Sequence, residues 1–384
     1  MPGTRAATEP EWSLLFAACS ADRRRDQTQA LLQSTLRWNV VLDQADRHGV
    51  EPLLYQALSD FRELIPVEQF NSLAQKYQTN VYKSLMLSRE LIRIVDELSA
   101  VGVAVMPYKG VALAEAVYGD IAMRRSGDID LFVRAADLTR VCEALAKLGF
   151  TKQLQRSPAE ERSYLKSGYE LVFDGIAGPN LLEVQWAIQP RFYSVDFDIE
   201  GLFRRSIIVP VAGHPMKTPS LEDLFVLLSL HAAKHVWGRL IWLSDLARIV
   251  EISKLDWRQI GITAKSLGIQ RILRVTLLLV NRVLDMPIPS SAETSIPQDE
   301  AAVQLAKEIE TYILGDRAFD VESIAYFRLM LRLRERWQDR ARFVRRLAFT
   351  SGPSEWAAIR LPEPLFPLYR IVRVTRLAAK LVRA

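Results

Sequence analysis

The chain has 384 residues, of which 49% are apolar and 25% are charged, and its net charge is +5. This length predicts two or three domains, and the composition is that of a globular protein rather than a low-complexity or fibrous one. The two cysteines, Cys19 and Cys142, are far apart and form neither a disulfide framework nor a zinc-binding pattern. No uncharged apolar run reaches the ~18 residues of a membrane span. We therefore expect a cytoplasmic protein without a membrane span.

The first region, residues 1–100, is predicted to be helical. Apolar residues recur there at intervals of three and four, as on the buried face of a helix. Gly102 follows the last such stripe, where a glycine commonly ends a helix. That stripe consists of Leu87, Leu91, Ile94, Val95 and Leu98.

The second region, residues 101–215, has the mixed pattern of a small α/β unit. Short β-type runs alternate there with helical segments, and Gly149 ends the clearest helix. The predicted elements are, in order, a strand in "VAVMPYKG", a helix in "VALAEAVYGD", a strand in "DIDLFVR", a helix in "AADLTRVCEALAKLGF", and strands in "YELVFDG" and "NLLEVQWAI" joined by a hairpin at "GIAGPN".

The third region, residues 216–384, is again predicted to be helical, starting near Leu221, and it ends in arginine-rich helices. From Arg328 onward there are 14 Lys+Arg and 4 Asp+Glu, a net charge of +10. Such a surface suits an anionic partner, although solvated faces of amphipathic helices have the same composition. The sequence leaves open whether the two helical regions form one domain around the α/β unit.

Two aspartates lie within a segment that otherwise resembles a buried strand. In "DIDLFV" the alternation of a strand places Ile129, Leu131 and Val133 on one face, and Asp128 and Asp130 on the other. Aspartate is depleted in strands, so this pair needs an explanation. Mg²⁺ uses one or two carboxylates together with substrate phosphates, which makes a metal–nucleotide site one explanation. Ion pairs with the preceding arginines are the structural alternative.

Neighbouring residues favour the metal–nucleotide interpretation. Lys109-Gly110 opens a helix, where backbone N–H groups attract phosphate. Arg125 is a candidate phosphate contact. Glu183 lies within the apolar strand "NLLEVQWAI", and a carboxylate there needs a partner if it is buried. A neighbouring strand would bring it beside the two aspartates, and three carboxylates can hold the two ions of a phosphoryl-transfer site.

These segments resemble a known family when they are taken as a set. The series "YKGVALAEAVYGDIAMRRSGDIDLFV", "LLEVQWAI" and "HAAKHVWGRLIWLSDLARIV" is similar to an uncharacterised bacterial nucleotidyltransferase family of the polymerase-β-like nucleotidyltransferase superfamily. The likeness in layout extends from "RHGVEPLLYQAL" to "RERWQDRARF". It implies an α+β fold, in which a small polymerase-β-like sheet with flanking helices lies between the two helical regions.

The resemblance also implies roles for individual residues. Asp128 and Asp130 match the metal-binding pair of the family, and Glu183 matches its third carboxylate. Lys109 and Gly110 stand where the wider superfamily has Gly-Ser at the start of the nucleotide-contacting helix. Gln185 departs from related sequences, which tend to carry histidine there; glutamine cannot act as an acid or base near pH 7.

A histidine pair in the third region has two interpretations. His231 and His235 are four residues apart and share a helix face. Zinc would need a third ligand, and the metalloprotease pattern would need glutamate at position 232, which is alanine. A packed histidine pair is favoured, with Lys234 or His235 lining the cleft as the functional alternative.

Two functions from different classes therefore remain. The first is a Mg²⁺-dependent nucleotidyltransferase, with Mn²⁺ as the alternative ion, that transfers a nucleoside monophosphate from an NTP such as ATP to an unknown hydroxyl acceptor. The acceptor is a small molecule, a protein or RNA. The second is an inactive module of the same fold that binds a nucleotide, protein or nucleic acid. The chain has no Walker A, G-x-G-x-x-G or G-x-S-x-G motif, so kinases, dehydrogenases and hydrolases of those types have no support.

Overall fold

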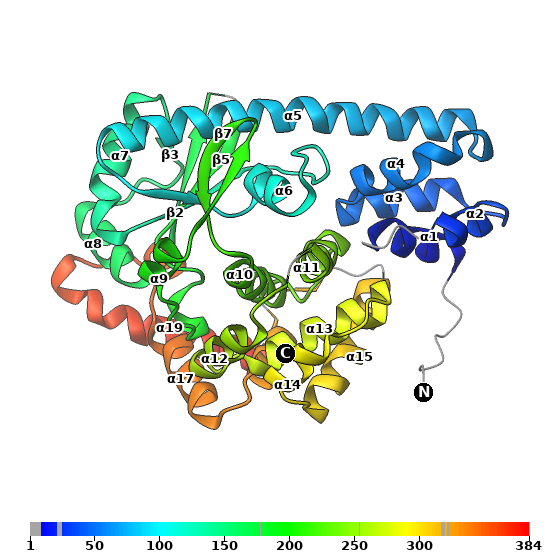
Figure 1. Cartoon of the computed structure of the whole chain (residues 1–384). Helices are drawn as coiled ribbons and strands as arrows, with labels where there is room; N and C mark the ends of the chain where they lie inside the picture. Colours follow the sequence, from blue (N-terminus) through cyan, green and yellow to red (C-terminus); the bar gives the residue numbers. More distant parts are fainter. Residues whose placement is uncertain are drawn as a thin grey trace.

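The structure of the protein is a computed structural model that describes residues 9–20, 25–176, 178–252, 254–315, 319–320 and 323–383. Helices predominate, and a small mixed sheet lies among them (Figure 1). This is the α+β fold with flanking helices that the sequence predicted, which is therefore confirmed.

The N-terminal region is helical, as its apolar periodicity indicated. α3 ends at Gly49, whose positive φ of 70° closes the helix in the left-handed conformation. Figure 1 shows α5 as one long helix that runs past the other N-terminal helices and on to the sheet. The elements are α1 (Pro10–Cys19), α2 (Arg25–Leu32), α3 (Trp38–His48), α4 (Glu51–Leu58), the 3-10 helix η1 (Ser59–Leu64) and α5 (Val67–Ala100).

The α/β unit follows and contains two sheets. In the described residues the larger sheet has the strand order β1-β2-β5-β4-β3; β2 and β5 are parallel, and the other neighbours are antiparallel. The elements are β1 (Val105–Pro107), α6 (Gly110–Tyr118), β2 (Ile129–Val133), η2 (Ala135–Asp137), α7 (Leu138–Lys147), β3 (Thr151–Lys152), α8 (Pro158–Ser167), β4 (Glu170–Gly175), β5 (Gly178–Gln185), η3 (Arg191–Tyr193), α9 (Ile199–Arg204), β6 (Ile207–Val211) and β7 (His214–Thr218).

The β6–β7 hairpin was not anticipated from the sequence. Ala212 and Gly213 form its turn, and both have positive φ, as a tight two-residue hairpin turn requires. The hairpin packs on β1 and α6, and Thr218 donates a hydrogen bond from Oγ1 to the Pro107 carbonyl at 2.9 Å. It thereby supports the β1–α6 connection, which carries Lys109.

The C-terminal region is helical to the end of the described residues. α10 and α11 are separated by a break at Val236 and Trp237, both of which have positive φ. The elements are α10 (Leu221–Lys234), α11 (Leu240–Ile252), α12 (Trp257–Leu267), α13 (Gln270–Leu284), α14 (Ser290–Ser295), α15 (Glu300–Leu314), α16 (Ile324–Arg332), α17 (Trp337–Phe349), α18 (Pro353–Ala358), η4 (Glu363–Leu368) and α19 (Tyr369–Arg383).

The two faces of the larger sheet belong to different cores. Ile129, Leu131 and Val133 pack with the buried faces of α5 and α7. Phe132, on the other face of β2, belongs to a larger core that contains residues of both the N-terminal and the C-terminal helices. Asp130 shares that second face with Phe132, since side chains alternate along a strand. The polar centre of the sheet therefore points toward the helical regions.

Candidate active site

Two carboxylates face each other on neighbouring parallel strands. In the register of β2 and β5, Asp130 pairs with Glu183. Asp128 directly precedes β2, and the alternation of the strand places it on the same side as Asp130. Asp130 is only 3% exposed. The structure thus brings together the three residues that the sequence analysis singled out, which we call the carboxylate cluster: Asp128, Asp130 and Glu183.

Burial and neighbouring charges raise the pKa of two members of the carboxylate cluster, Glu183 and Asp128. Burial raises the pKa of Glu183 to about 8, and the charges of Asp130 and Glu170 add to this effect. Burial also raises the pKa of Asp128, and Asp130 is the next cause. Glu170 lies on β4, opposite Gln185, and burial raises its pKa as well. Close carboxylates in a poorly solvated place favour the uptake of protons or cations.

Lys109 supplies one cation to the carboxylate cluster. Its Nζ lies 2.6 Å from Asp130 Oδ1, and the side chain is 11% exposed. Burial alone would lower the pKa of Lys109, but the charge of Asp130, together with Tyr108, the hydrogen bond to Asp130 and the charge of Glu183, raises the pKa above its ordinary value. The ammonium group is therefore charged and held at the centre of the site.

Gly110 allows the first turn of α6 to approach the cluster closely. Its φ is +58°, and a Cβ atom at this position would lie 3.2 Å from the Asp128 carbonyl oxygen. Only glycine adopts this backbone conformation without strain. The N-terminus of α6 consequently lies against the segment that carries Asp128, and helix N-termini attract anions.

Gln185 joins the two strands of the cluster by hydrogen bonds. Its Nε2 donates to Glu183 Oε2 at 3.0 Å and to Asp130 Oδ1 at 3.4 Å. Its Oε1 accepts a hydrogen bond from the Tyr108 hydroxyl at 2.8 Å, and the Tyr108 ring stacks on Phe132. Gln185 is therefore a side chain that orients two carboxylates and does not titrate.

Arg125, the candidate phosphate contact, has carboxylate partners elsewhere. Its Nη1 lies 2.6 Å from Asp46 Oδ1 in α3 and 2.8 Å from Glu51 Oε1 in α4. The side chain is 49% exposed. The structure therefore places Arg125 as a link between the α/β unit and the N-terminal helices, rather than beside the carboxylate cluster.

Arg124, one of the two arginines considered as partners of the aspartate pair, pairs with Asp245 in α11 instead. It is 7% exposed, and its Nε donates to Asp245 Oδ2 at 2.9 Å; Tyr118 donates to Asp245 Oδ1 at 2.9 Å. The charge of Arg124 lowers the pKa of Asp128, which burial and Asp130 raise. The "RR" dipeptide gave no signal to distinguish the two arginines, since only the tertiary position of Asp245 does so.

Lys234 and His235 lie at the C-terminal end of α10. Lys234 donates from Nζ to the Tyr169 hydroxyl at 3.2 Å, and burial lowers the pKa of Lys234 although nearby Glu170 opposes that change. Burial, with the charge of Lys234, lowers the pKa of His235 to about 4, so its ring is neutral at pH 7. The rings of His231 and His235 pack against each other and against Trp242.

The residues of the cluster suit a hard divalent cation by their chemistry, since carboxylate oxygens are the ligands that Mg²⁺ takes in proteins. Their raised pKa values show that further positive charge would be stabilised there. In the part of the chain that the structure describes, no three His, Cys, Asp or Glu side chains are arranged so as to hold a metal ion. Lys109 is the cation in contact with Asp130.

Comparison with known protein families gives one match. Residues 34–285 match a family described as uncharacterised nucleotidyltransferase. The chain belongs to this family. Comparisons with curated proteins and with solved structures give no match. The matched range of the nucleotidyltransferase family contains the whole carboxylate cluster, Lys109 and the histidine pair. Family membership supports a general nucleotidyltransferase activity with an NTP as substrate.

No helix in the described part of the chain is both long enough and apolar enough to cross a membrane.

Proposed function

We propose that the protein transfers a nucleoside monophosphate from an NTP to a hydroxyl acceptor and releases pyrophosphate, in a reaction that depends on Mg²⁺ or Mn²⁺. The observation that carries this proposal is the pairing of Asp130 with Glu183 on parallel strands, beside Asp128 and the ammonium group of Lys109. Family membership provides the general activity.

In their present arrangement the three carboxylates do not form a metal site, and Asp130 contacts Lys109. Asp128, Asp130 and Glu183 would hold the metal ion by exchanging that contact for the ion. When bound, such an ion supplies positive charge to the phosphate oxygens of the nucleotide. Lys109 and the N-terminus of α6 would orient the triphosphate, because both are positively charged and lie at the cluster. Gln185 keeps the carboxylates of the two strands in place through its two donated hydrogen bonds.

In the transfer step the acceptor oxygen forms a bond to the α-phosphorus, and the bond between that phosphorus and the bridging oxygen to the β-phosphorus breaks. Pyrophosphate leaves with that oxygen. The acceptor hydroxyl loses its proton in this step, and Glu183 is the residue to which we assign the uptake of that proton.

Titration calorimetry with the four NTPs, with and without Mg²⁺, tests this proposal. We expect Mg²⁺-dependent binding of at least one NTP by the wild type, and a loss of at least about 100-fold, or about 2.7 kcal/mol, in Asp128→Asn/Asp130→Asn. Asp43→Asn, an exposed position on α3, is the matched control. Nucleotide binding that is unchanged in the folded double variant, or absent from the wild type, would contradict the proposal.

The Lys109–Asp130 ion pair favours one second candidate, an inactive module that binds its ligand without a metal. Gln185, which does not titrate, agrees with this candidate. It predicts ligand binding that survives loss of the carboxylates and weakens with salt. Release of pyrophosphate from an NTP would exclude it.

A further inference from the structure

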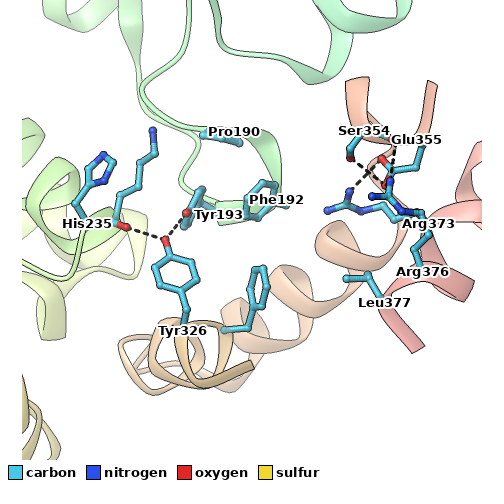
Figure 2. A pocket seen from close by; sticks show the side chains of 12 residues that line it. Pro190, Phe192, Tyr193, His235, Tyr326, Ser354, Glu355, Arg373, Arg376 and Leu377 are labelled. Carbon is cyan, nitrogen blue, oxygen red and sulfur yellow. Dashed lines mark hydrogen bonds and ion pairs between the residues drawn. The ribbon is translucent and has the colours of Figure 1, made fainter. Parts of the chain in front are cut away.

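A cavity of about 310 Å³ lies beyond the C-terminal end of β5 and is built from α10, η3, α16, α18 and α19. In Figure 2, Tyr193, Tyr326 and His235 lie on one side, and Glu355, Arg373 and Arg376 lie on the other. Its volume is in the range of small-molecule sites. Most of the lining side chains are aromatic or ionisable, and Pro190, Ser354 and Leu377 complete the lining.

The aromatic side of the cavity is held in place by hydrogen bonds. The hydroxyl groups of Tyr193 and Tyr326 are in contact, and Tyr326 also donates to the Lys234 carbonyl at 2.8 Å. Phe192 stacks on Tyr193 with ring centroids 4.5 Å apart, and Phe327 also lines the cavity. A wall of fixed rings suits a flat apolar ligand, because stacked rings add to the gain from apolar burial.

The opposite side carries an excess of positive charge. Arg373 and Arg376 both pair with Glu355, which is 2% exposed, at 3.2 and 2.9 Å. Lys234 adds a third cation from the side of the tyrosines, where His235 lines the cavity as a neutral ring. The lining therefore contains three cations and one carboxylate, and this balance favours a ligand with an anionic group.

Lys234 joins the cavity to the carboxylate cluster. Its side chain lines the cavity, while its Nζ donates to the hydroxyl of Tyr169. Tyr169 accepts a hydrogen bond from Trp186 N at 3.0 Å, just after the end of β5, and precedes Glu170, the register partner of Gln185. Lys234 and Tyr169 thus connect the cavity lining to the end of the strand that carries Glu183.

We propose that this cavity binds the acceptor of the transfer reaction, and that the acceptor is a small hydroxylated molecule with a flat apolar body and an anionic group, such as a hydroxyaryl carboxylate. The apolar body lies against Phe192 and Phe327, the anionic group faces Lys234 and Arg376, and the hydroxyl group faces the carboxylate cluster. The inference rests on the proposed function for its catalytic part and on the cavity for its binding part.

Three probes of related shape test the binding part by calorimetry: 4-hydroxyphenylacetate, tyramine and glycerol 3-phosphate. The first has the ring, hydroxyl and negative charge; tyramine reverses the charge, and glycerol 3-phosphate lacks the ring. We expect 4-hydroxyphenylacetate to bind at least about tenfold more tightly than either of the others, a difference of about 1.4 kcal/mol. Equal binding of the three, or no binding of the first, would overturn the proposal.

Variants of the cavity lining test whether 4-hydroxyphenylacetate binds in the cavity. Leu377→Trp fills the cavity without removing an ion pair, and it should weaken 4-hydroxyphenylacetate binding by at least about tenfold. Leu368→Trp, at an exposed position in the preceding segment, is its control. Arg376→Met, with exposed Arg370→Met as control, tests the charged side separately. Binding that is insensitive to both cavity variants would overturn the proposal.

The two proposals fail in different ways. Leu377→Trp should keep Mg²⁺-dependent NTP binding, whereas Asp128→Asn/Asp130→Asn should keep probe binding. If the probe binds in the cavity but never receives a nucleotide while the wild type transfers to another acceptor, such as RNA or a protein, the acceptor inference is overturned and the proposed function stands. If no NTP binds, the proposed function fails.

Discussion

Two buried groups of charged side chains lie on either side of the segment that leads into β2, and they are organised differently. The Arg124 group contains Asp245, whose carboxylate receives hydrogen bonds from Arg124 and from Tyr118. Burial raises the pKa of Asp245, and both partners oppose that rise. This group ties α6 and the β2 approach to α11, so we infer that it stabilises the fold.

The pKa of Asp245 remains raised in spite of its partners, and the carboxylate cluster differs in that, besides burial, the charge of Asp130 raises the pKa of both Asp128 and Glu183. Lys109 contacts Asp130, yet the pKa of Glu183 is raised to about 8 and that of Asp128 is also raised, by burial first and then by Asp130. A buried group with unsatisfied charge costs stability, and such groups are concentrated at functional sites. We infer from these two groups that buried charged side chains at this sheet form a binding site where protein partners of opposite charge do not neutralise them.

The largest expected loss of stability comes from removing the counter-ion of Arg124. Asp245→Asn leaves Arg124 buried without its counter-ion, and loss of one partner of a buried pair costs about 3–5 kcal/mol. Denaturant unfolding should show this loss, while Asp43→Asn at an exposed position changes stability by less than about 0.5 kcal/mol. A loss as small as that of the control would show that the Arg124 group does not stabilise the fold.

The next effect is a pH dependence in the carboxylate cluster. The pKa of Glu183 rises from 4.5 to about 8 on folding, so the folded state holds a proton between these pH values that the unfolded state releases. The stability from this group is therefore present below pH 4.5 and is lost as the pH rises to about 8, by about 4 kcal/mol. Unfolding free energies measured from pH 5 to 8 should fall in the wild type and remain flatter in Glu183→Gln. If the unfolding free energies of the wild type and of Glu183→Gln changed with pH in the same way, the raised pKa assigned to Glu183 would be wrong.

A smaller effect tests the close approach of α6 to the cluster. Gly110 and Gly119 both have positive φ, but only a Cβ at Gly110 meets a neighbour within 4 Å, the Asp128 carbonyl oxygen. Gly119→Ala should cost about 1 kcal/mol from backbone strain alone. Gly110→Ala should cost about 1 kcal/mol more and should also weaken NTP binding. Equal losses of stability, with NTP binding intact, would show that the contact is unimportant.

The smallest effect concerns Arg125. Because its partners Asp46 and Glu51 lie in the N-terminal helices and its side chain is half exposed, Arg125→Met should cost about 1 kcal/mol. NTP affinity should change less than about twofold, against more than about tenfold for Lys109→Met. An equal loss of NTP affinity in both variants would indicate that Arg125 contacts the nucleotide.

Strand alternation and the position of Glu183 in an apolar run were enough to single out the three carboxylates, whereas the α+β fold was implied by the resemblance to the nucleotidyltransferase family. The register that pairs Asp130 with Glu183 was not predictable in detail, since it depends on a parallel contact between strands that are far apart in sequence. A capping box at Ser157 and Glu160 was readable as the start of α8 and was overlooked.

Other features have no local signal. The different environments of Arg124 and Arg125 depend on Asp245 and Glu51, which are distant in the sequence. The cavity is assembled from five separate elements, so its aromatic and basic residues appear in the sequence only as ordinary helix positions.

The most direct test of the account is the unfolding free energy of the wild type and of Asp128→Asn, each measured with and without Mg²⁺ and NTP. Asp128 is a carboxylate whose charge burial and Asp130 disfavour. We predict that, without ligand, Asp128→Asn is at least as stable as the wild type. With ligand at 100 times its dissociation constant, only the wild type should gain about 2.7 kcal/mol. The opposite result would be a variant that is less stable than the wild type without ligand and that gains as much stability from Mg²⁺ and NTP. That result would contradict the assignment of this cluster as a binding site.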